Sequence, residues 1–283
     1  MKKTLLIIFA ASLFGSVAVS QDAKYSQQLI TRFEQIKSYN SSIIKNGNYR
    51  PQCITPILRD VKRNWDKLTD EAKDFFKVFV TRPTLSGPEV VEFTDYFDIH
   101  YTLSGADAVD PTDNDVNGVS DYIDFMVTIF DSIYLADSLR NYTMPPFDDG
   151  KGGSDFLDVY VGVFVGAGVY GYVAFDSLIG DNPKSTTIVE INAAMSYVAM
   201  RNNYIGFSGN EKNDIRVTFA HEFSHAIDFG YNSNLSGVFM EAKGPWEEEK
   251  LFPVIDDNLQ YLESIFCTPD IALNWDDDTD GSG

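Results

Sequence analysis

The fold is decided by residues 213–230, which read NDIRVTFAHEFSHAIDFG. The large apolar residues of this stretch recur every four positions, as in the buried stripe of a helix: Ile215, Phe219, Phe223 and Ile227. Asn213 or Asp214 can cap the start of such a helix, and Gly230 can end it. We therefore expect a helix over about residues 213–229.

The same stretch contains His221, Glu222 and His225 in an H-E-x-x-H pattern. Residues four apart on a helix lie about 6 Å apart along its axis, so both imidazoles can bind one ion. Glu222 projects from the same turn and can meet a water molecule beside that ion. The alternative is a chance match, but the chain has only three histidines and two have this spacing. We expect His221 and His225 to bind zinc, with Glu222 as the general base.

A catalytic zinc site has three protein ligands and one open position. The only other histidine, His100, lies in an expected strand without any motif spacing, and we interpret it as structural. An acidic third ligand is therefore expected. The nearest candidates downstream of the H-E-x-x-H pattern are the acidic residues between positions 239 and 249.

The segment Phe239-Met240-Glu241-Ala242, followed by Trp246, resembles the gluzincins. These are zinc peptidases in which H-E-x-x-H precedes a glutamate ligand on a second helix. The resemblance is greatest to a group of secreted bacterial metalloproteases and covers about residues 82–265. It implies a zincin-like fold with Glu241 as the third zinc ligand. The sequence departs from the family at Gly244-Pro245, because a proline predicts an interruption of the helix there. Glu247, Glu248 and Glu249 are the alternative ligands, and Tyr231 and Tyr261 are candidates for stabilising the oxyanion.

The expected fold class is α+β. Residues 21–90 form a small helical segment, either a pro-region or a cap, with helices over Tyr25–Lys37 and Leu58–Val80 separated by Asn40–Asn48. The turn-rich residues 82–88 join it to the domain of residues 91–283, a zincin-like mixed sheet with the active-site helix. The elements expected in this domain are the helix Tyr122–Leu139 and the strands Tyr96–Leu103, Phe156–Val165, Val169–Phe175 and Thr186–Ile191.

Residues 113–124 have the register of an EF-hand-type calcium loop, with Gly118 at the sixth position. The expected calcium ligands are Asp113, Asp115, Asn117, the carbonyl of Val119, Asp121 and Asp124. The alternative is an acidic, solvated turn. Calcium here would be structural.

The first 20 residues have the features of a secretory signal peptide in their usual order. Lys2 and Lys3 are basic, Leu5–Phe14 is apolar and too short to span a membrane, and Ala18-Val19-Ser20 is a small-x-small cleavage site. We expect cleavage near Ser20 and a secreted or periplasmic protein that is not held in a membrane.

The formal net charge of −20 over 283 residues argues against a nucleic-acid partner, because phosphate backbones would be repelled. We expect a monomer that acts on proteins or peptides. The alternative function is a calcium-stabilised secreted binding or adhesion module that has lost catalysis.

Two cysteines, Cys53 and Cys267, leave three alternatives open. They can form one disulfide, since the chain is exported. They can remain free thiols. In the third alternative, Cys53 reaches the zinc and blocks it until a pro-segment is removed, because thiolate is a good zinc ligand.

Overall fold

The computed structural model describes residues 20–46, 53–163, 168–207, 210–257 and 259. The expected signal peptide, apart from Ser20, lies outside these residues, as do Cys267 and Tyr261. None of the helices in the described part of the chain is long and apolar enough to cross a bilayer.

A mixed five-stranded sheet forms the centre of the described structure, in the order β1-β2-β3-β5-β4. The three inner strands, β2, β3 and β5, run parallel, and the edge strands β1 and β4 are antiparallel to their neighbours. The strands are β1 (Val90–Phe93), β2 (Phe97–Tyr101), β3 (Leu157–Gly162), β4 (Gly171–Gly180) and β5 (Ala193–Arg201). The fold class is α+β, as expected.

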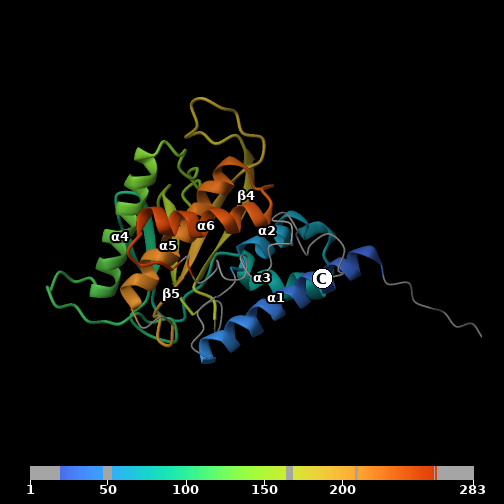
Figure 1. The fold of residues 1–283 in the computed structure, drawn as a ribbon. Coiled ribbons are helices and arrows are strands. Elements are labelled where there is room, and N and C mark those ends of the chain that lie inside the picture. The colour runs from blue at the N-terminus through green and yellow to red at the C-terminus, as the bar shows by residue number, and fades with distance from the viewer. Residues whose placement is uncertain (1–19, 47–52, 164–167, 208–209, 258, 260–283) are drawn as a thin grey trace, which may run out of the picture.

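Helices cover both faces of this sheet (Figure 1). One face packs against α4 (Asp121–Leu139), α5 (Glu211–Tyr231) and α6 (Gly237–Leu251). The other face packs against α1 (Gln21–Asn46), α2 (Thr55–Arg63) and α3 (Asp70–Val80). Each face of the sheet has its own hydrophobic core, because successive side chains of a strand point to opposite faces. On β5, for example, Val198 belongs to the first core, and Tyr197 and Ala199 belong to the second.

The N-terminal helices differ from the expected ones in two respects. First, α1 continues through Asn40 to Asn46, so the polar stretch that starts at Asn40 does not end the helix. Second, the expected helix Leu58–Val80 is two helices joined by a 3-10 turn over Trp65–Lys67. The break follows from Thr69, which has an extended backbone and whose hydroxyl accepts a hydrogen bond from the Ala72 N–H at the start of α3.

The expected strand Thr186–Ile191 was wrong, since that stretch lies in the connection between β4 and β5. Its β-branched side chains Ile188, Val189 and Ile191 are exposed, so no packing supports a strand there. The strand β5 that follows is rich in alanine and methionine, and its side chains are buried on both faces. A central strand of this kind lacks the alternation that marks a strand in sequence.

The expected join at residues 82–88 is attached firmly to the sheet through Arg82. Its guanidinium donates to Asp176 on β4 at 2.9 Å and to Asp148 at 2.7 Å, and it pairs with Asp158 on β3. Asp148 and Asp158 are buried, so the charge of Arg82 is needed to balance theirs. The connection between the N-terminal helices and the sheet is therefore a packed, charged contact.

Candidate metal centre

Two histidines project from one side of α5, and one of them, His221, lines a small cavity. The opposite side of the helix is fixed by Phe219 and Phe223, whose rings pack edge-on against Phe97 of β2 at centroid distances of 5.3 and 5.5 Å. His221 and His225 point the other way, with ring centroids 4.7 Å apart. The helix begins two residues earlier than expected, at Glu211, because the side chain of Asn210 accepts the N–H of Asn213.

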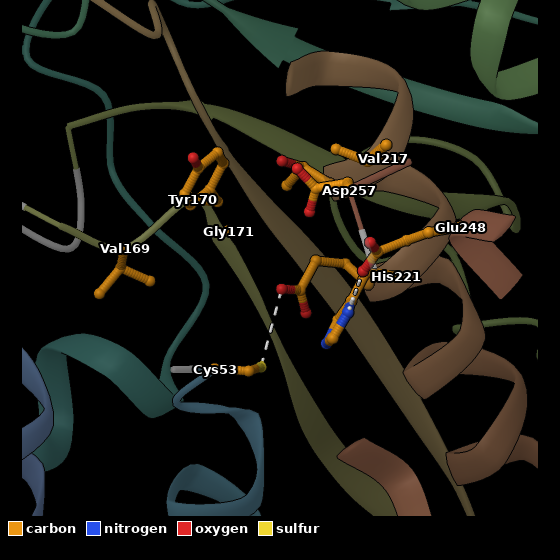
Figure 2. Close-up of a pocket in the computed structure, with 10 residues that line it drawn as sticks. Cys53, Val169, Tyr170, Gly171, Val217, His221, Glu248 and Asp257 are labelled. Atoms are coloured by element: carbon orange, nitrogen blue, oxygen red, sulfur yellow. Dashed lines mark hydrogen bonds and ion pairs between the residues drawn. The ribbon is translucent and has the colours of Figure 1, made fainter. Parts of the chain in front are cut away.

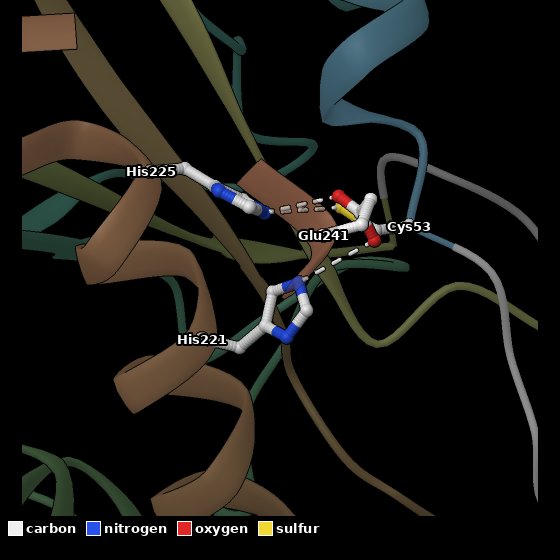
Figure 3. A group of neighbouring side chains, drawn as sticks. All are labelled: Cys53, His221, His225 and Glu241. Carbon is white, nitrogen blue, oxygen red and sulfur yellow. Dashed lines mark hydrogen bonds and ion pairs between the residues drawn. The ribbon is translucent and has the colours of Figure 1, made fainter. Parts of the chain in front are cut away.

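Helix α6 brings Glu241 to the same point (Figure 3). The carboxylate of Glu241 lies 3.3 Å from Nε2 of His225 and 3.9 Å from Nε2 of His221. The expected interruption at Pro245 was wrong, since α6 is continuous from Gly237 to Leu251 with Pro245 inside it. The proline removes the hydrogen bond to the carbonyl of Glu241, and the side chain of Glu241 nevertheless points at both imidazoles.

Gly244 allows α6 to approach His221 closely. A Cβ atom at this position would lie 2.4 Å from Nδ1 and Cε1 of the His221 ring, well inside van der Waals contact. Any other residue would push the helix or the ring away. The Gly244-Pro245 pair, which departs from the family pattern, therefore has a local steric role in this site.

A carboxylate orients the imidazole of His221 from behind. Nδ1 of His221 donates to Oε1 of Glu248 at 2.7 Å, so Nε2 is the nitrogen that faces Glu241. Nδ1 of His225 lies 3.9 Å from Asp228, which is itself paired with Lys243 at 2.7 Å. The sequence suggested Glu248 only as an alternative metal ligand. In the structure Glu248 contacts Nδ1 of His221, the ring nitrogen that faces away from Glu241.

The N-terminal segment supplies a fourth potential ligand. Sγ of Cys53, directly before α2, lies 3.7 Å from Nε2 of His225 and 3.7 Å from Oε1 of Glu222. The Thr55 hydroxyl donates to Oε2 of Glu222 at 3.2 Å. Figure 2 shows Cys53 on one side of the pocket and His221 with Glu248 on the other. The Cys53 thiol is free in this structure.

The donor set fits a zinc ion. Ligand atoms bound to tetrahedral zinc at about 2.0–2.2 Å lie about 3.4 Å from one another. Oε1 of Glu241 lies 3.3 Å from Nε2 of His225, close to this value, and the other oxygen, Oε2, lies 3.9 Å from Nε2 of His221. Nε2 of His221 is a buried atom without a hydrogen-bond partner, which is costly unless a cation binds there. One nitrogen, sulfur or oxygen atom from each of Cys53, His221, His225 and Glu241 lies within 4.8 Å of the others.

The electrostatics of the pocket favour positive charge. Burial lowers the pKa of His225, but Asp228 and Glu241 raise it more strongly, to about 10. Burial raises the pKa of Glu222, and the two histidines offset this only in part. Burial also raises the pKa of the Cys53 thiol, and the charges of Glu222 and Glu241 raise it further. Without a metal, protons on the imidazoles supply the charge that the carboxylates require.

The predicted calcium loop brings three of its expected carboxylate ligands together. Carboxylate oxygens of Asp113, Asp115 and Asp121 lie within 4.8 Å of one another. Asp113 accepts the backbone N–H of Gly118, which lowers the pKa of Asp113, and Gly118 has the positive φ of 95° that the sharp turn needs. Asn117 and Asp124 adjoin this group. The backbone N–H of Asn117 donates to Asp113 and Asp115, and its side-chain amide donates to Asp115 and Asp124. The backbone N–H of Val119 donates to the side chain of Asn117.

Four further residues lie away from the cluster. His100 is buried on the other face of the sheet, with Glu89 at 2.6 Å and Asp158 at 2.9 Å, in agreement with a structural role. Glu247 pairs with Arg140 and accepts the Tyr142 hydroxyl at 2.8 Å. The Tyr231 hydroxyl accepts the Thr143 N–H at 2.7 Å, and Glu249, like Tyr231, does not line the pocket.

Sequence reasoning gave no role to several residues at the pocket. Among them are Thr55, which donates to Glu222, and Tyr170 and Thr218, which line the cavity. Only the tertiary structure brings them beside the histidines.

None of the protein-family models, curated proteins and solved structures compared with the chain matches it. The function of the site must therefore be inferred from its own geometry.

Proposed function

We propose that the protein is an exported zinc-dependent peptidase of gluzincin type, with a zincin-like fold. The observation that carries this proposal is the convergence of His221, His225 and Glu241 from two helices, at separations of 3.3 and 3.9 Å from the glutamate. These separations, one from each oxygen of the carboxylate, bring the three side chains close enough to bind one zinc ion. Two imidazoles and one carboxylate are the ligand set of many hydrolytic zinc sites, and a buried glutamate adjoins them.

Each side chain of the site has a distinct role in peptide hydrolysis. His221, His225 and Glu241 would hold zinc, with Glu248 keeping His221 in the tautomer whose Nε2 faces the ion. Zinc, when bound, would polarise the scissile carbonyl and lower the pKa of a water molecule to about 7. Glu222 takes a proton from the attacking water and passes it to the leaving amine. The burial that raises the pKa of Glu222 suits a group that must both accept and release a proton.

The edge strand β4 is suited to hold an extended peptide. It is the last strand on its side of the described sheet, and its first residue, Gly171, lies against Glu222. The Val173 N–H points away from β5, since it donates to the Thr55 side chain. A substrate strand paired with this edge would lie across the metal centre.

Zinc content and hydrolysis of casein test the proposal. The purified protein should bind one zinc ion per chain, measured by inductively coupled plasma mass spectrometry. Glu222→Gln should keep the zinc and lose about 100-fold or more of the hydrolysis, because the proton acceptor is removed. Glu249→Gln, an equal change of charge on α6 away from the pocket, is the matched control and should retain both.

Two results would count against a peptidase. Absence of zinc from the wild-type protein after reconstitution would remove the basis of the chemistry. Bound zinc without hydrolysis, in the wild type and in the Cys53 variants described below, would favour a non-catalytic binding module.

A further inference from the structure

The cluster contains one more ligand than a catalytic zinc site uses. Catalytic zinc keeps one position open, whereas four protein ligands are typical of closed sites. Sγ of Cys53 lies 3.7 Å from Nε2 of His225, close to the separation of about 3.5 Å expected for sulfur and nitrogen bound to one tetrahedral zinc. Figure 3 shows Cys53 beside Glu241, facing both imidazoles from the side opposite α5.

The residues next to Cys53 also cover the proposed base and the substrate edge. The Thr55 hydroxyl donates to Oε2 of Glu222 at 3.2 Å and accepts the N–H of Val173 from β4 at 2.9 Å. One short segment, Cys53–Thr55, therefore contacts the metal cluster, the base and the edge strand. These are the three places that a peptide substrate and the attacking water need.

The space left in the pocket is small. The cavity beside His221 and Glu222 has a volume of about 40 Å³. About 10–15 Å³ of such a cavity admits one water molecule, so it has room for a few waters. Cys53 is one of the residues that line it.

On the basis of the proposed function, we infer that Cys53 is the fourth zinc ligand and that the Cys53–Thr55 segment keeps the peptidase latent. The thiol loses its proton to solvent when sulfur binds zinc. Opening breaks the zinc–sulfur bond, the departing thiolate regains a proton from solvent, and a water molecule takes the vacated position. Thr55 leaves with the same segment, which frees Glu222 and the edge of β4. A purely structural Cys-His-His-Glu site would have no use for a buried glutamate held beside it.

Spectroscopy of the full chain detects the proposed ligand without relying on activity. X-ray absorption at the zinc edge should show one sulfur at about 2.3 Å in the wild type and none in Cys53→Ser. With cobalt in place of zinc, the wild type should show a thiolate-to-cobalt charge-transfer band that Cys53→Ser lacks. Cys267→Ser is the matched control and should keep both signals. The wild-type spectra do not depend on the folding of any variant.

Hydrolysis tests the latency. Cys53→Ser and Cys53→Ala should keep one zinc per chain and hydrolyse casein about tenfold or more faster than the wild type, because the internal competitor is removed. Adding Glu222→Gln to Cys53→Ser should abolish the gain.

The outcomes separate this inference from the proposed function. Zinc without sulfur in the wild type overturns the role of Cys53 and leaves the peptidase intact. A second outcome is sulfur on zinc in the wild type while both Cys53 variants fold but either hydrolyse casein no faster than the wild type or bind no zinc. That result overturns the latency and indicates a closed structural site. Absence of zinc from the wild type overturns the proposed function itself.

Discussion

At the residue scale, the metal centre depends on groups that hold the ligands in position. Glu248 accepts a hydrogen bond from the far nitrogen of His221 at 2.7 Å, and both groups are largely buried. Partners of this kind fix the tautomer of the imidazole and raise its basicity. Such partners hold a histidine of α5 in the orientation that metal binding requires before the metal arrives.

Glu248→Gln should lower zinc affinity by about 10- to 100-fold, because an amide holds the imidazole less firmly than a carboxylate does. Competition with a zinc-binding dye measures the change. Glu249→Gln removes the same charge from the next residue and should leave the affinity within twofold. Equal losses in the two variants would mean that the net charge of α6, and not the contact with His221, determines binding.

Gly244 is a second residue whose role is steric. Gly244→Ala should destabilise the fold by about 1–3 kcal/mol, because the new methyl group overlaps the His221 ring. The same displacement should weaken zinc binding, which calorimetry can measure alongside thermal unfolding. Gly237→Ala on the same helix is the control, since its nearest atom would be 3.2 Å away and belongs to Pro56, far from the histidines. Unchanged zinc affinity in Gly244→Ala would show that α6 can move without loss.

At the element scale, the loop between β2 and α4 has the backbone of a metal-binding turn. Its acidic side chains accept backbone N–H groups of the loop, and the loop ends at Ser120, whose side chain caps α4. A cation held by Asp113, Asp115 and Asp121 would relieve the repulsion of three close carboxylates. The first two of these residues precede the cap, and Asp121 is the first residue of α4, so binding there would fix the start of that helix.

Calcium should therefore raise the melting temperature by about 5–10 °C when present at about 100 times its dissociation constant. Differential scanning calorimetry with and without calcium measures the shift. Asp113→Asn should abolish most of it, whereas Asp155→Asn, at an exposed position outside the loop, should preserve it. A shift that survives in Asp113→Asn would place the calcium elsewhere.

At the scale of the whole molecule, the N-terminal helices are part of the core. Residues of α1, α2 and α3 share a hydrophobic cluster with Tyr160, Tyr172 and Tyr197 of the sheet. Phe33 of α1 packs edge-on against Phe75 and Phe76 of α3, each at 5.6 Å. A segment packed in this way should unfold together with the sheet.

Phe33→Ala should lower the free energy of unfolding by about 3–5 kcal/mol, because it leaves a cavity in the shared core. Denaturant unfolding, followed by tryptophan fluorescence and by circular dichroism, should give one coincident transition for wild type and variant. Val78→Ala, at an exposed site on α3, is the control and should change stability by less than about 0.5 kcal/mol. Two separate transitions in the wild type would indicate an independent N-terminal domain.

The sequence alone determined the elements whose signals are local. The spacing of His221, Glu222 and His225 placed three side chains on one helix, because four residues make about one turn. The four-residue repeat of Ile215 and Phe219 predicted the side of that helix that packs in the apolar core, although most of the helix is buried. The α+β class followed from helical and strand patterns that alternate along the chain.

Only the tertiary structure decided what those elements meet. Local pattern predicted a strand at Thr186–Ile191 and missed β5, because β-branched residues favour a strand only where packing supports them. Pro245 predicted a break in α6, yet the helix continues past this proline. Gly244, the residue before it, packs directly against the ring of His221. Cys53 lies 168 residues before His221 in the chain, and no spacing rule could bring its sulfur to the histidines. Segments that are distant in the sequence come into contact because their apolar side chains are buried in the same two hydrophobic cores. These cores form only when the whole chain folds.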